Sequence, residues 1–290
     1  MSVKDRVDPY SVAPLLRKHL IGDGYDIVFD LGKSHGAWVS DARNGSEYLD
    51  FYTFFASLPL GFNHPIFSEA GASRRLFEAA VHKPANSDSH TFELASFAGS
   101  FSRHAMTDSF RHLFFIEGGA LAVENALKAA FDWKTRLNLE AGRDACPGDK
   151  ILHFQQAFHG RSGYTLSLTN TSPEKTDLFP KFDWPRGANP KVRFPPDALE
   201  TERVARAEAE CREDILGCFA RHPGRIAAII VEPIQGEGGD NHFRKEFFED
   251  LRRIADDQPA LLIFDEVQTG FGLTGKMWAH QHFDVVPDIL

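Results

Sequence analysis

The sequence predicts an α/β fold in which a mostly parallel sheet carries helices on both of its faces. From residue 112 onward, short apolar runs alternate with longer segments that have a helical pattern. Runs such as IAAIIV and LLIF are continuous and apolar, as is typical of strands that are buried on both sides. The composition is that of an ordinary globular protein, since 42% of the 290 residues are hydrophobic and 25% are charged.

The leading part of the chain, residues 1–60, reads as an irregular N-terminal segment with short antiparallel strands and a turn at Asn44-Gly45. We place the one candidate domain boundary near residue 60, so that residues 61–290 form the second domain. The helices that we expect cover residues 67–83, 91–105, 120–138, 199–220 and 245–257. The strands that we expect in the parallel sheet cover residues 112–117, 150–157, 225–232 and 260–266.

Charge and cysteine content narrow the class of protein. The net charge of −9 argues against nucleic acid or an acidic membrane surface as the main partner. The three cysteines are few and scattered, which favours free thiols over disulfides or a metal site. The charged start of the chain is unlike a signal peptide, and IAAIIV is too short to span a bilayer. We therefore expect a soluble, cytoplasmic protein.

Two acids stand at the ends of predicted strands, where ligands bind in parallel sheets. Glu232 ends IAAIIVE, and Asp265 ends LLIFD. Either acid could instead cap a helix or face solvent. Because Asp265 directly follows four apolar residues, burial of its carboxylate would cost free energy unless a cationic partner lies beside it.

Two further segments fall at the same edge of the sheet. Gly118 and Gly119 separate a strand from a helix, which suits an anion such as phosphate, although the turn matches neither G-x-G-x-x-G nor a P-loop. The segment QQAFHGRSGY supplies Phe158, His159 and Arg161. Taken singly, Phe158 could be a core residue, His159 a hydrogen-bonded residue and Arg161 a surface cation. Together these groups suit pyridoxal 5′-phosphate, whose pyridine nitrogen needs a carboxylate such as Asp265 to keep it protonated.

Several longer motifs of the sequence resemble those of a known enzyme family. EPIQGEGG (Glu232 to Gly239) and DEVQTGFGLTG (Asp265 to Gly275) resemble the signature of class III, fold-type I, pyridoxal-phosphate-dependent aminotransferases. EGGALAVENALKAAFDWK, FHGRSGYTLSLTNT and GDNHFRKEFF resemble the L-lysine 6-aminotransferase (lysine ε-aminotransferase) branch of this class.

The resemblance implies roles for nine residues. It implies that the backbone of Gly119 and Ala120 holds the phosphate, that Phe158, followed by His159, stacks on the ring, and that Asp265 pairs with the pyridinium nitrogen. It also implies that Gln268 approaches the ring hydroxyl and the substrate, that Arg161 binds the α-carboxylate of the substrate, that Glu237 moves aside for the second substrate, and that Glu232 supports the site from behind.

The implied reaction transfers the ε-amino group of L-lysine to 2-oxoglutarate. Its products are 2-aminoadipate 6-semialdehyde and glutamate. The family also implies a homodimer when the protein is full length, and no metal ion.

The sequence departs from the family pattern at its end. No lysine follows Lys276, which we interpret as a surface cation, so the Schiff-base lysine of the family is missing. We therefore interpret the sequence as an N-terminal fragment, with residues 1–60 from the small domain and 61–290 from a truncated, incomplete large domain. This 290-residue chain is expected to be inactive as it stands.

Three alternatives remain open at this point. The chain could belong to a nucleotide-binding oxidoreductase, although its glycine pattern is imperfect for that class. It could be another class III ω-aminotransferase that acts on ornithine or 4-aminobutyrate. It could also be a non-catalytic binding protein with the same fold. The sequence does not separate lysine breakdown from secondary metabolism as the pathway.

Overall fold

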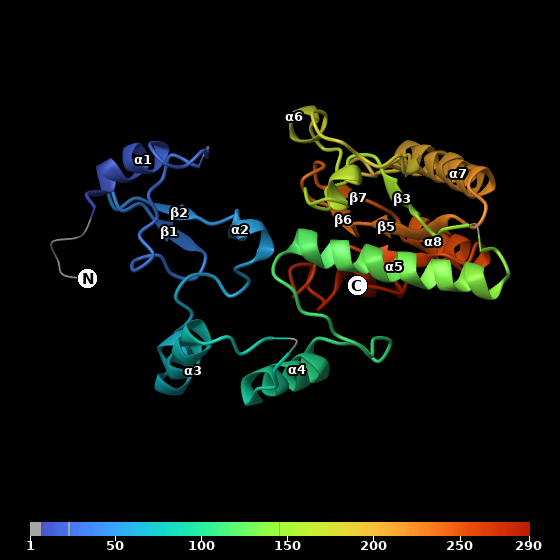
Figure 1. Ribbon diagram of the computed structural model, residues 1–290. Helices are drawn as coiled ribbons and strands as arrows, with labels where there is room; N and C mark the ends of the chain where they lie inside the picture. The colour runs from blue at the N-terminus through green and yellow to red at the C-terminus, as the bar shows by residue number, and fades with distance from the viewer. Residues whose placement is uncertain (1–6, 23, 87, 145) are drawn as a thin grey trace. The chain divides into compact units, whose positions relative to one another are not determined.

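The computed structural model forms two compact units, residues 1–104 and 105–290, which are described separately (Figure 1). The described residues are 7–22, 24–86, 88–144 and 146–290. The domain boundary expected near residue 60 lies inside the first unit. The boundary was expected to separate the small domain of the family from its large domain. The division into compact units does not test this assignment, so it stays a prediction.

The first unit contains a hairpin and several helices. Strands β1 and β2 pair in antiparallel fashion, and Gly45 in the turn between them has φ +76°, a conformation that favours glycine. The predicted strands and their turn are therefore confirmed, as are the two predicted helices, α3 and α4. The elements are α1 (Pro9–Arg17), β1 (Trp38–Ser40), β2 (Glu47–Leu49), α2 (Thr53–Ala56), a 3₁₀ turn (Pro65–Ser68), α3 (Ala70–Val81) and α4 (Phe92–His104).

The second unit is an α/β structure built on a four-stranded sheet. The strand order is β4-β3-β5-β8, and every neighbouring pair is parallel, as predicted. Its elements are α5 (Gly119–Glu140), β3 (Lys150–Phe154), a 3₁₀ turn (Thr165–Ser167), α6 (Pro173–Thr176), β4 (Arg186–Gly187), α7 (Ala198–Arg221), β5 (Ile226–Val231), β6 (Ile234–Gln235), β7 (Asn241–His242), α8 (Lys245–Asp257), β8 (Leu261–Phe264) and a 3₁₀ turn (Ala279–His282). Beyond β8, Ile289 forms a parallel bridge to Ile263.

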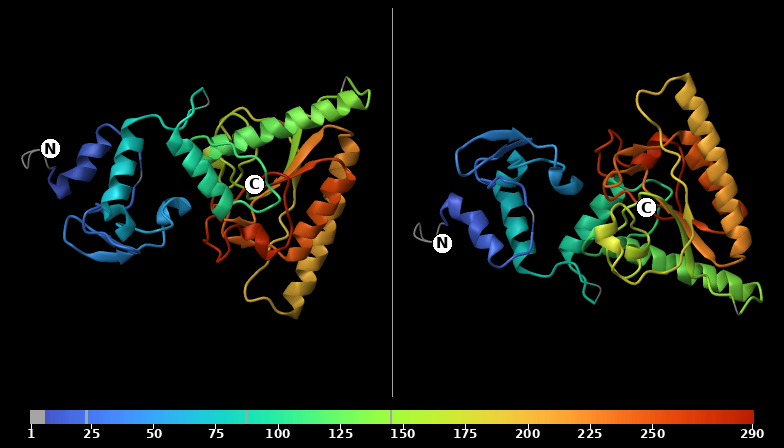
Figure 2. Two further views of the ribbon diagram at one scale, coloured as in Figure 1. Left: turned by 90° about the horizontal axis from the view of Figure 1, so that it is seen from below. Right: turned by 90° about the horizontal axis from the view of Figure 1, so that it is seen from above.

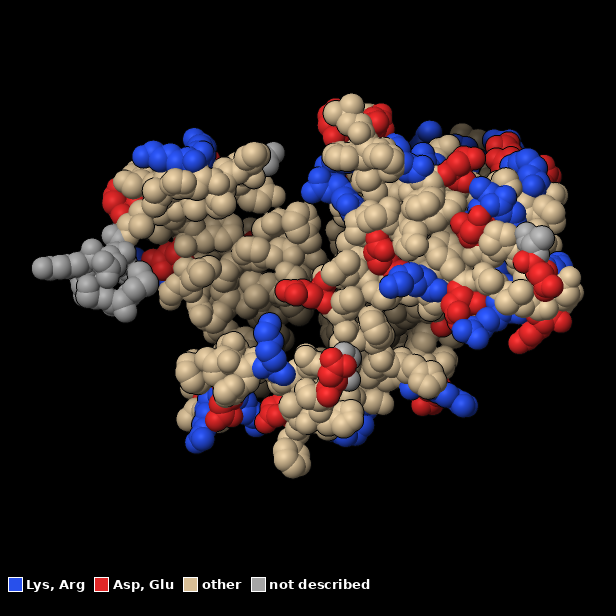
Figure 3. Space-filling view, in the orientation of Figure 1, with Lys and Arg blue, Asp and Glu red and all other residues tan. Residues whose placement is uncertain are grey.

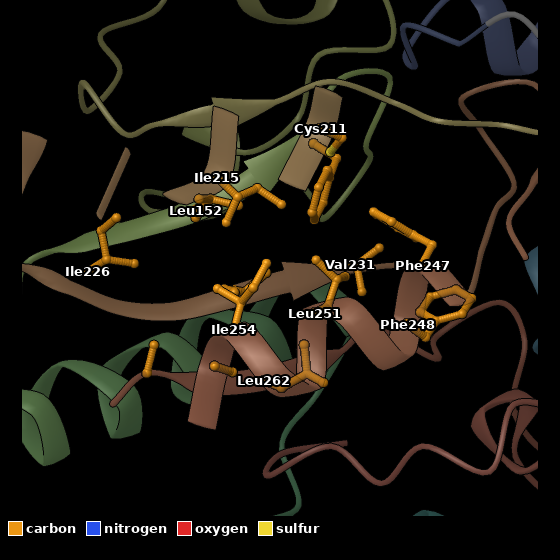
Figure 4. Packing of buried hydrophobic residues seen from close by; sticks show 14 of the residues in the cluster. Leu152, Cys211, Ile215, Ile226, Val231, Phe247, Phe248, Leu251, Ile254 and Leu262 are labelled. Carbon is orange, nitrogen blue, oxygen red and sulfur yellow. The ribbon is translucent and has the colours of Figure 1, made fainter. Parts of the chain in front are cut away.

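Helices cover both faces of this sheet, as the continuous apolar strands predict (Figure 2). Along β5, Ile229 belongs to the cluster that contains α7 and α8, whereas Ile230 belongs to the cluster that contains α5. Figure 4 shows the first cluster, in which Ile215 of α7 and Leu251 of α8 pack around the strand residues. Burial of these side chains, at about 1.5–3 kcal/mol each, holds the strands in place beneath the candidate site.

One predicted strand is wrong. Residues 112–116 have no regular secondary structure, and Phe114 is 70% exposed. The apolar pattern of this segment suits a strand, but a strand also needs a neighbour to which it can hydrogen-bond. In the described chain the sheet is bordered by β4 on one side and by Ile289 on the other, and neither pairs with this segment.

The surface of the second unit mixes charges of both signs on the face seen in Figure 3. Among the described residues, no helix is both long and apolar enough to cross a bilayer. The three cysteines are free thiols, and Cys211 is buried in the apolar cluster that also contains residues of α8 and the sheet.

Candidate functional site

The two strand-end acids lie side by side at one edge of the sheet. Val231 of β5 and Phe264 of β8 are register partners, so the next residues, Glu232 and Asp265, leave the sheet together. The Asp265 amide donates to the Val231 carbonyl at 2.9 Å. Both acids are buried, with exposures of 5% for Glu232 and 8% for Asp265. The structure therefore brings together at one edge the two acids that the sequence placed at strand ends.

Asp265 has a buried protein partner. Nδ1 of His159 donates to Oδ2 of Asp265 across 2.7 Å, since an ionised carboxylate can only accept. Burial opposes a charge on His159, but the hydrogen bond that its ring donates to Asp265 and the charges of Asp265 and Glu232 outweigh this effect and raise the pKa of His159. The His159 amide donates to Thr169 Oγ1 at 3.0 Å, which fixes the backbone that carries the ring.

Glu232 holds the segment that precedes this histidine. Its Oε1 accepts a hydrogen bond from the Phe158 amide at 2.9 Å. Burial raises the pKa of Glu232 to about 7; the charge of His159 lowers this pKa and that of Asp265 raises it. Glu232, His159 and Asp265 thus form one buried cluster of three titratable groups.

The start of α5 offers an uncapped helix terminus at this cluster. Gly118, the residue before the helix, has φ +89° and provides no side-chain cap. The first N–H groups of a helix lack partners within the helix, so Gly119 and Ala120 present donors suited to an anion. A Cβ on Gly119 would lie 3.0 Å from Val267, and one on Gly160 would lie 2.5 Å from the Ala120 Cβ. Both glycines therefore let three segments approach closely: the start of α5, the turn at Gly160 and the turn at Val267.

The loop between β6 and β7 completes the arrangement. Gly236 lies against Gln268, because a Cβ on this glycine would fall 2.0 Å from the Gln268 Oε1. Glu237 forms an ion pair with Lys175. The Lys175 Nζ in turn lies 5.8 Å from the centroid of the Phe158 ring.

The side chain of Arg161 forms no polar contact with the other predicted site residues that the structure describes. It is exposed, and no hydrogen bond or ion pair of its side chain is found within the described chain. It follows directly after Gly160, so its backbone lies at the edge of the cluster.

Sequence reasoning missed several residues that shape the site. Glu266, the second acid of the DE pair, accepts hydrogen bonds from the amides of Ala279 (2.6 Å) and His280 (2.8 Å) and from Thr269 Oγ1 (2.9 Å). Its role is therefore structural, because it fixes the turn that follows Asp265. Lys175 gave no signal in the sequence, since its partner Glu237 lies 62 residues away.

Comparison with known proteins decides the family. The model of the class-III aminotransferase family matches residues 22–290. The chain belongs to this family. The predicted fold class, a fold-type I aminotransferase with a mostly parallel sheet, is confirmed by a solved structure, the lysine aminotransferase from M. tuberculosis in the internal aldimine form. That structure has a TM-score of 0.93 and 50% identity, and it covers 98% of this chain and 65% of its own.

Curated relatives of this chain belong to the same class of aminotransferases. The L-lysine-epsilon aminotransferase of Mycobacterium tuberculosis (strain ATCC 25618 / H37Rv) is 50% identical over 283 residues, which is 97% of this chain and 62% of the relative. That of Streptomyces clavuligerus is 46% identical, over 95% of this chain and 60% of the relative. A probable mitochondrial 4-aminobutyrate aminotransferase of Caenorhabditis elegans is 37% identical, over 88% of this chain and 56% of the relative. The chain thus spans less than two thirds of the length of these relatives.

The site fits pyridoxal 5′-phosphate, the cofactor of the class III aminotransferases. The uncapped start of α5 would suit the phosphate, and the tight packing at Gly119 and Gly160 would shape the backbone around it. Phe158 supplies a flat side chain, and Asp265 supplies a buried carboxylate that is already oriented by His159.

We predict that Glu232→Gln makes stability less sensitive to pH. The pKa of Glu232 rises on folding from 4.5 to about 7, so the folded protein holds a proton that the unfolded chain releases between these values. Stability of the unsubstituted protein should therefore fall as pH rises from about 5 to 7. The free energy of unfolding of the variant, relative to the unsubstituted protein, should increase by up to about 3 kcal/mol over that window.

Urea unfolding at several pH values between 5 and 8 measures this difference. Glu202→Gln, at an exposed position of α7, provides the baseline. If Glu232→Gln and the unsubstituted protein instead differ in free energy of unfolding by the same amount at every pH, that result would contradict the conclusion that buried Glu232 holds a proton.

Proposed function

We propose that the natural full-length protein is a pyridoxal-phosphate-dependent L-lysine 6-aminotransferase. It transfers the ε-amino group of L-lysine to 2-oxoglutarate and yields 2-aminoadipate 6-semialdehyde and glutamate. The observation that carries this proposal is the 46–50% identity to L-lysine-epsilon aminotransferases over nearly the whole chain. The 4-aminobutyrate aminotransferases are more distant, at 33–37% identity.

Pyridoxal phosphate, when bound, supplies a protonated pyridine ring that withdraws electrons from the reacting carbon. In this proposal the backbone of Gly119 and Ala120 holds the phosphate, and Phe158 lies against the ring. The Asp265 carboxylate keeps a proton on the pyridine nitrogen. His159 keeps that carboxylate turned toward the site through the bond at 2.7 Å. Gln268 approaches the ring hydroxyl.

Two residues face the substrates in this proposal. Arg161 binds the α-carboxylate of lysine, which leaves the ε-amino group directed toward the cofactor. Its exposed side chain is consistent with a role in binding a ligand that comes from solvent. In this proposal Glu237 moves aside for the second substrate. Glu237 and Phe158 share Lys175 as a neighbour, which supports a position of this carboxylate near the site.

We also propose that the full-length protein is a cytoplasmic homodimer. The resemblance to the family supports the dimer. The free thiols and the acidic net charge support a reducing cytoplasm rather than an anionic surface as its setting.

The substrate proposal is tested by product analysis. The full-length protein, with cofactor and 2-oxoglutarate, is given L-lysine, L-ornithine or 4-aminobutyrate in turn. We expect kcat/KM for lysine to exceed that for either competitor by about tenfold or more, because one methylene or one carboxylate contact alone discriminates by about this factor. A preference for ornithine or 4-aminobutyrate would overturn the substrate and leave the class of enzyme intact.

Asp265→Asn should abolish most of the turnover while the cofactor still binds. Asparagine keeps the shape of the side chain but not the negative charge that holds the proton on the pyridine nitrogen. We expect kcat to fall by about 10²–10³-fold, the size typical of losing one preorganised electrostatic contact. Steady-state kinetics and cofactor absorbance measure the two effects, with the exposed Asp257→Asn as the matched control. Near-normal turnover would remove Asp265 from this role.

Arg161→Ala should impair lysine binding without loss of the cofactor. A charge-assisted contact to a carboxylate contributes about 1.5–3 kcal/mol, so KM for lysine should rise by about 10- to 150-fold. The cofactor absorbance spectrum should not change. Arg206→Ala, at an exposed position of α7, is the control. Release of the cofactor from the Arg161 variant would contradict the assignment to the substrate.

A further inference from the structure

Glu124 of α5 holds the turn that carries Arg161. Its Oε1 accepts a hydrogen bond from the Tyr164 amide at 2.7 Å. A Cβ on Gly163 would lie 3.5 Å from the same oxygen, which is ordinary van der Waals contact, so the turn packs against this carboxylate. The two partners of the hydrogen bond are 40 positions apart, and the bond therefore joins segments that are distant in the sequence.

The same turn contacts α5 at a second point, one helical turn earlier. A Cβ on Gly160 would lie 2.5 Å from the Cβ of Ala120, so the two backbones come close together there. Ala120 and Glu124 are four residues apart and lie on one face of the helix. Arg161 stands between the two points of contact, directly after Gly160 and three residues before Tyr164. Its backbone is therefore held on both sides against the first turns of α5.

Other contacts keep the turn together without setting its place along the helix. The Ser162 amide donates to Thr165 Oγ1 at 2.9 Å, which lies within the turn itself. The Tyr164 ring packs beside Phe131 of α5, with ring centroids 5.6 Å apart. Apolar contact is not directional, whereas a hydrogen bond requires a defined distance and angle. The ring therefore keeps the turn near α5, and the bond to Glu124 determines where along the helix it sits.

The position of Arg161 relative to α5 decides which length of substrate fits. In the proposed function, the start of α5 holds the cofactor phosphate, and Arg161 binds the α-carboxylate of lysine. The separation of these two anchors must match a chain whose reacting amine is on the sixth carbon. Ornithine is one methylene shorter, so its amine falls short when its carboxylate is bound at the same place. A misplacement of about 1 Å at such an anchor can change a rate by about 10²-fold.

We propose that Glu124 is a positioning residue that makes this site select its amino donor by chain length, and the proposal rests on the lysine aminotransferase function proposed above. Through the Tyr164 amide, Glu124 fixes how far Arg161 lies from the start of α5. It acts through the turn and takes no part in the chemistry.

Kinetics of Glu124→Ala in the full-length enzyme test this role. Alanine favours the helix and removes the acceptor of the Tyr164 amide. We expect KM for lysine to rise, and the ratio of kcat/KM for L-lysine to that for L-ornithine to fall by about three- to tenfold, a part of the discrimination that one methylene supplies. The cofactor absorbance spectrum should not change.

Two further variants separate positioning from a general loss of structure. Glu124→Gln keeps an oxygen that can accept the same hydrogen bond, so its ratio should stay close to that of the unsubstituted enzyme. Glu140→Ala, at an exposed position near the end of the same helix, is the matched control. An unchanged ratio in Glu124→Ala, or an equal fall in Glu124→Gln, would overturn the proposal.

Hydrogen exchange separates this proposal from the proposed function. Exchange of the Tyr164 amide, followed by mass spectrometry of peptides that span residues 160–166, should be faster by about tenfold in Glu124→Ala, the size that the loss of one hydrogen bond can give. Glu140→Ala should exchange there like the unsubstituted protein. If the unsubstituted enzyme does not prefer lysine, the proposed function fails, and exchange in this segment alone decides whether Glu124 positions Arg161. Unchanged exchange in Glu124→Ala would rule out that role.

Discussion

The hydrogen bond between His159 and Asp265 is the interaction on which the rest of the site depends. It joins two residues 106 positions apart in the chain, and both side chains are buried. A buried carboxylate without a partner would cost several kcal/mol or take up a proton. His159 provides that partner from the protein itself, and the hydrogen bond fixes the orientation of the Asp265 carboxylate.

The parallel sheet makes this bond possible. Because β3, β5 and β8 are parallel neighbours, the residues that follow them emerge at one edge. That edge receives His159 after β3, Glu232 after β5 and Asp265 after β8. Gly160 then allows the start of α5 to approach the same point, because a Cβ there would collide with Ala120, and Gly119 packs closely against Val267. The anion-binding helix terminus and the acid therefore follow from the topology, which in turn rests on the two apolar clusters beneath.

Much of this could be predicted from local sequence signals, and the exceptions have physical reasons. Apolar runs and paired glycines reflect local structure, so the parallel sheet and the turn at Gly118 and Gly119 could be predicted. The run at 112–117 failed as a strand because pairing depends on a distant neighbour, which a local pattern cannot report. The partner of Asp265 was expected to be the cofactor, yet a histidine already fills part of that role. Lys175 and Glu266 could not be predicted as site residues, because their contacts depend on how loops that are distant in the sequence pack together. The roles of the site residues themselves came from family resemblance and remain predictions.

The most direct test of this account is the protonation of the His159 ring, followed by nitrogen-15 chemical shifts from pH 6 to 8. The account predicts that Nδ1 carries a proton throughout this range, because it donates to the Asp265 carboxylate whether or not Nε2 is protonated. A ring whose Nδ1 is unprotonated, or whose shifts titrate like those of an exposed histidine near pH 6.5, would show that the bond to Asp265 does not organise the site.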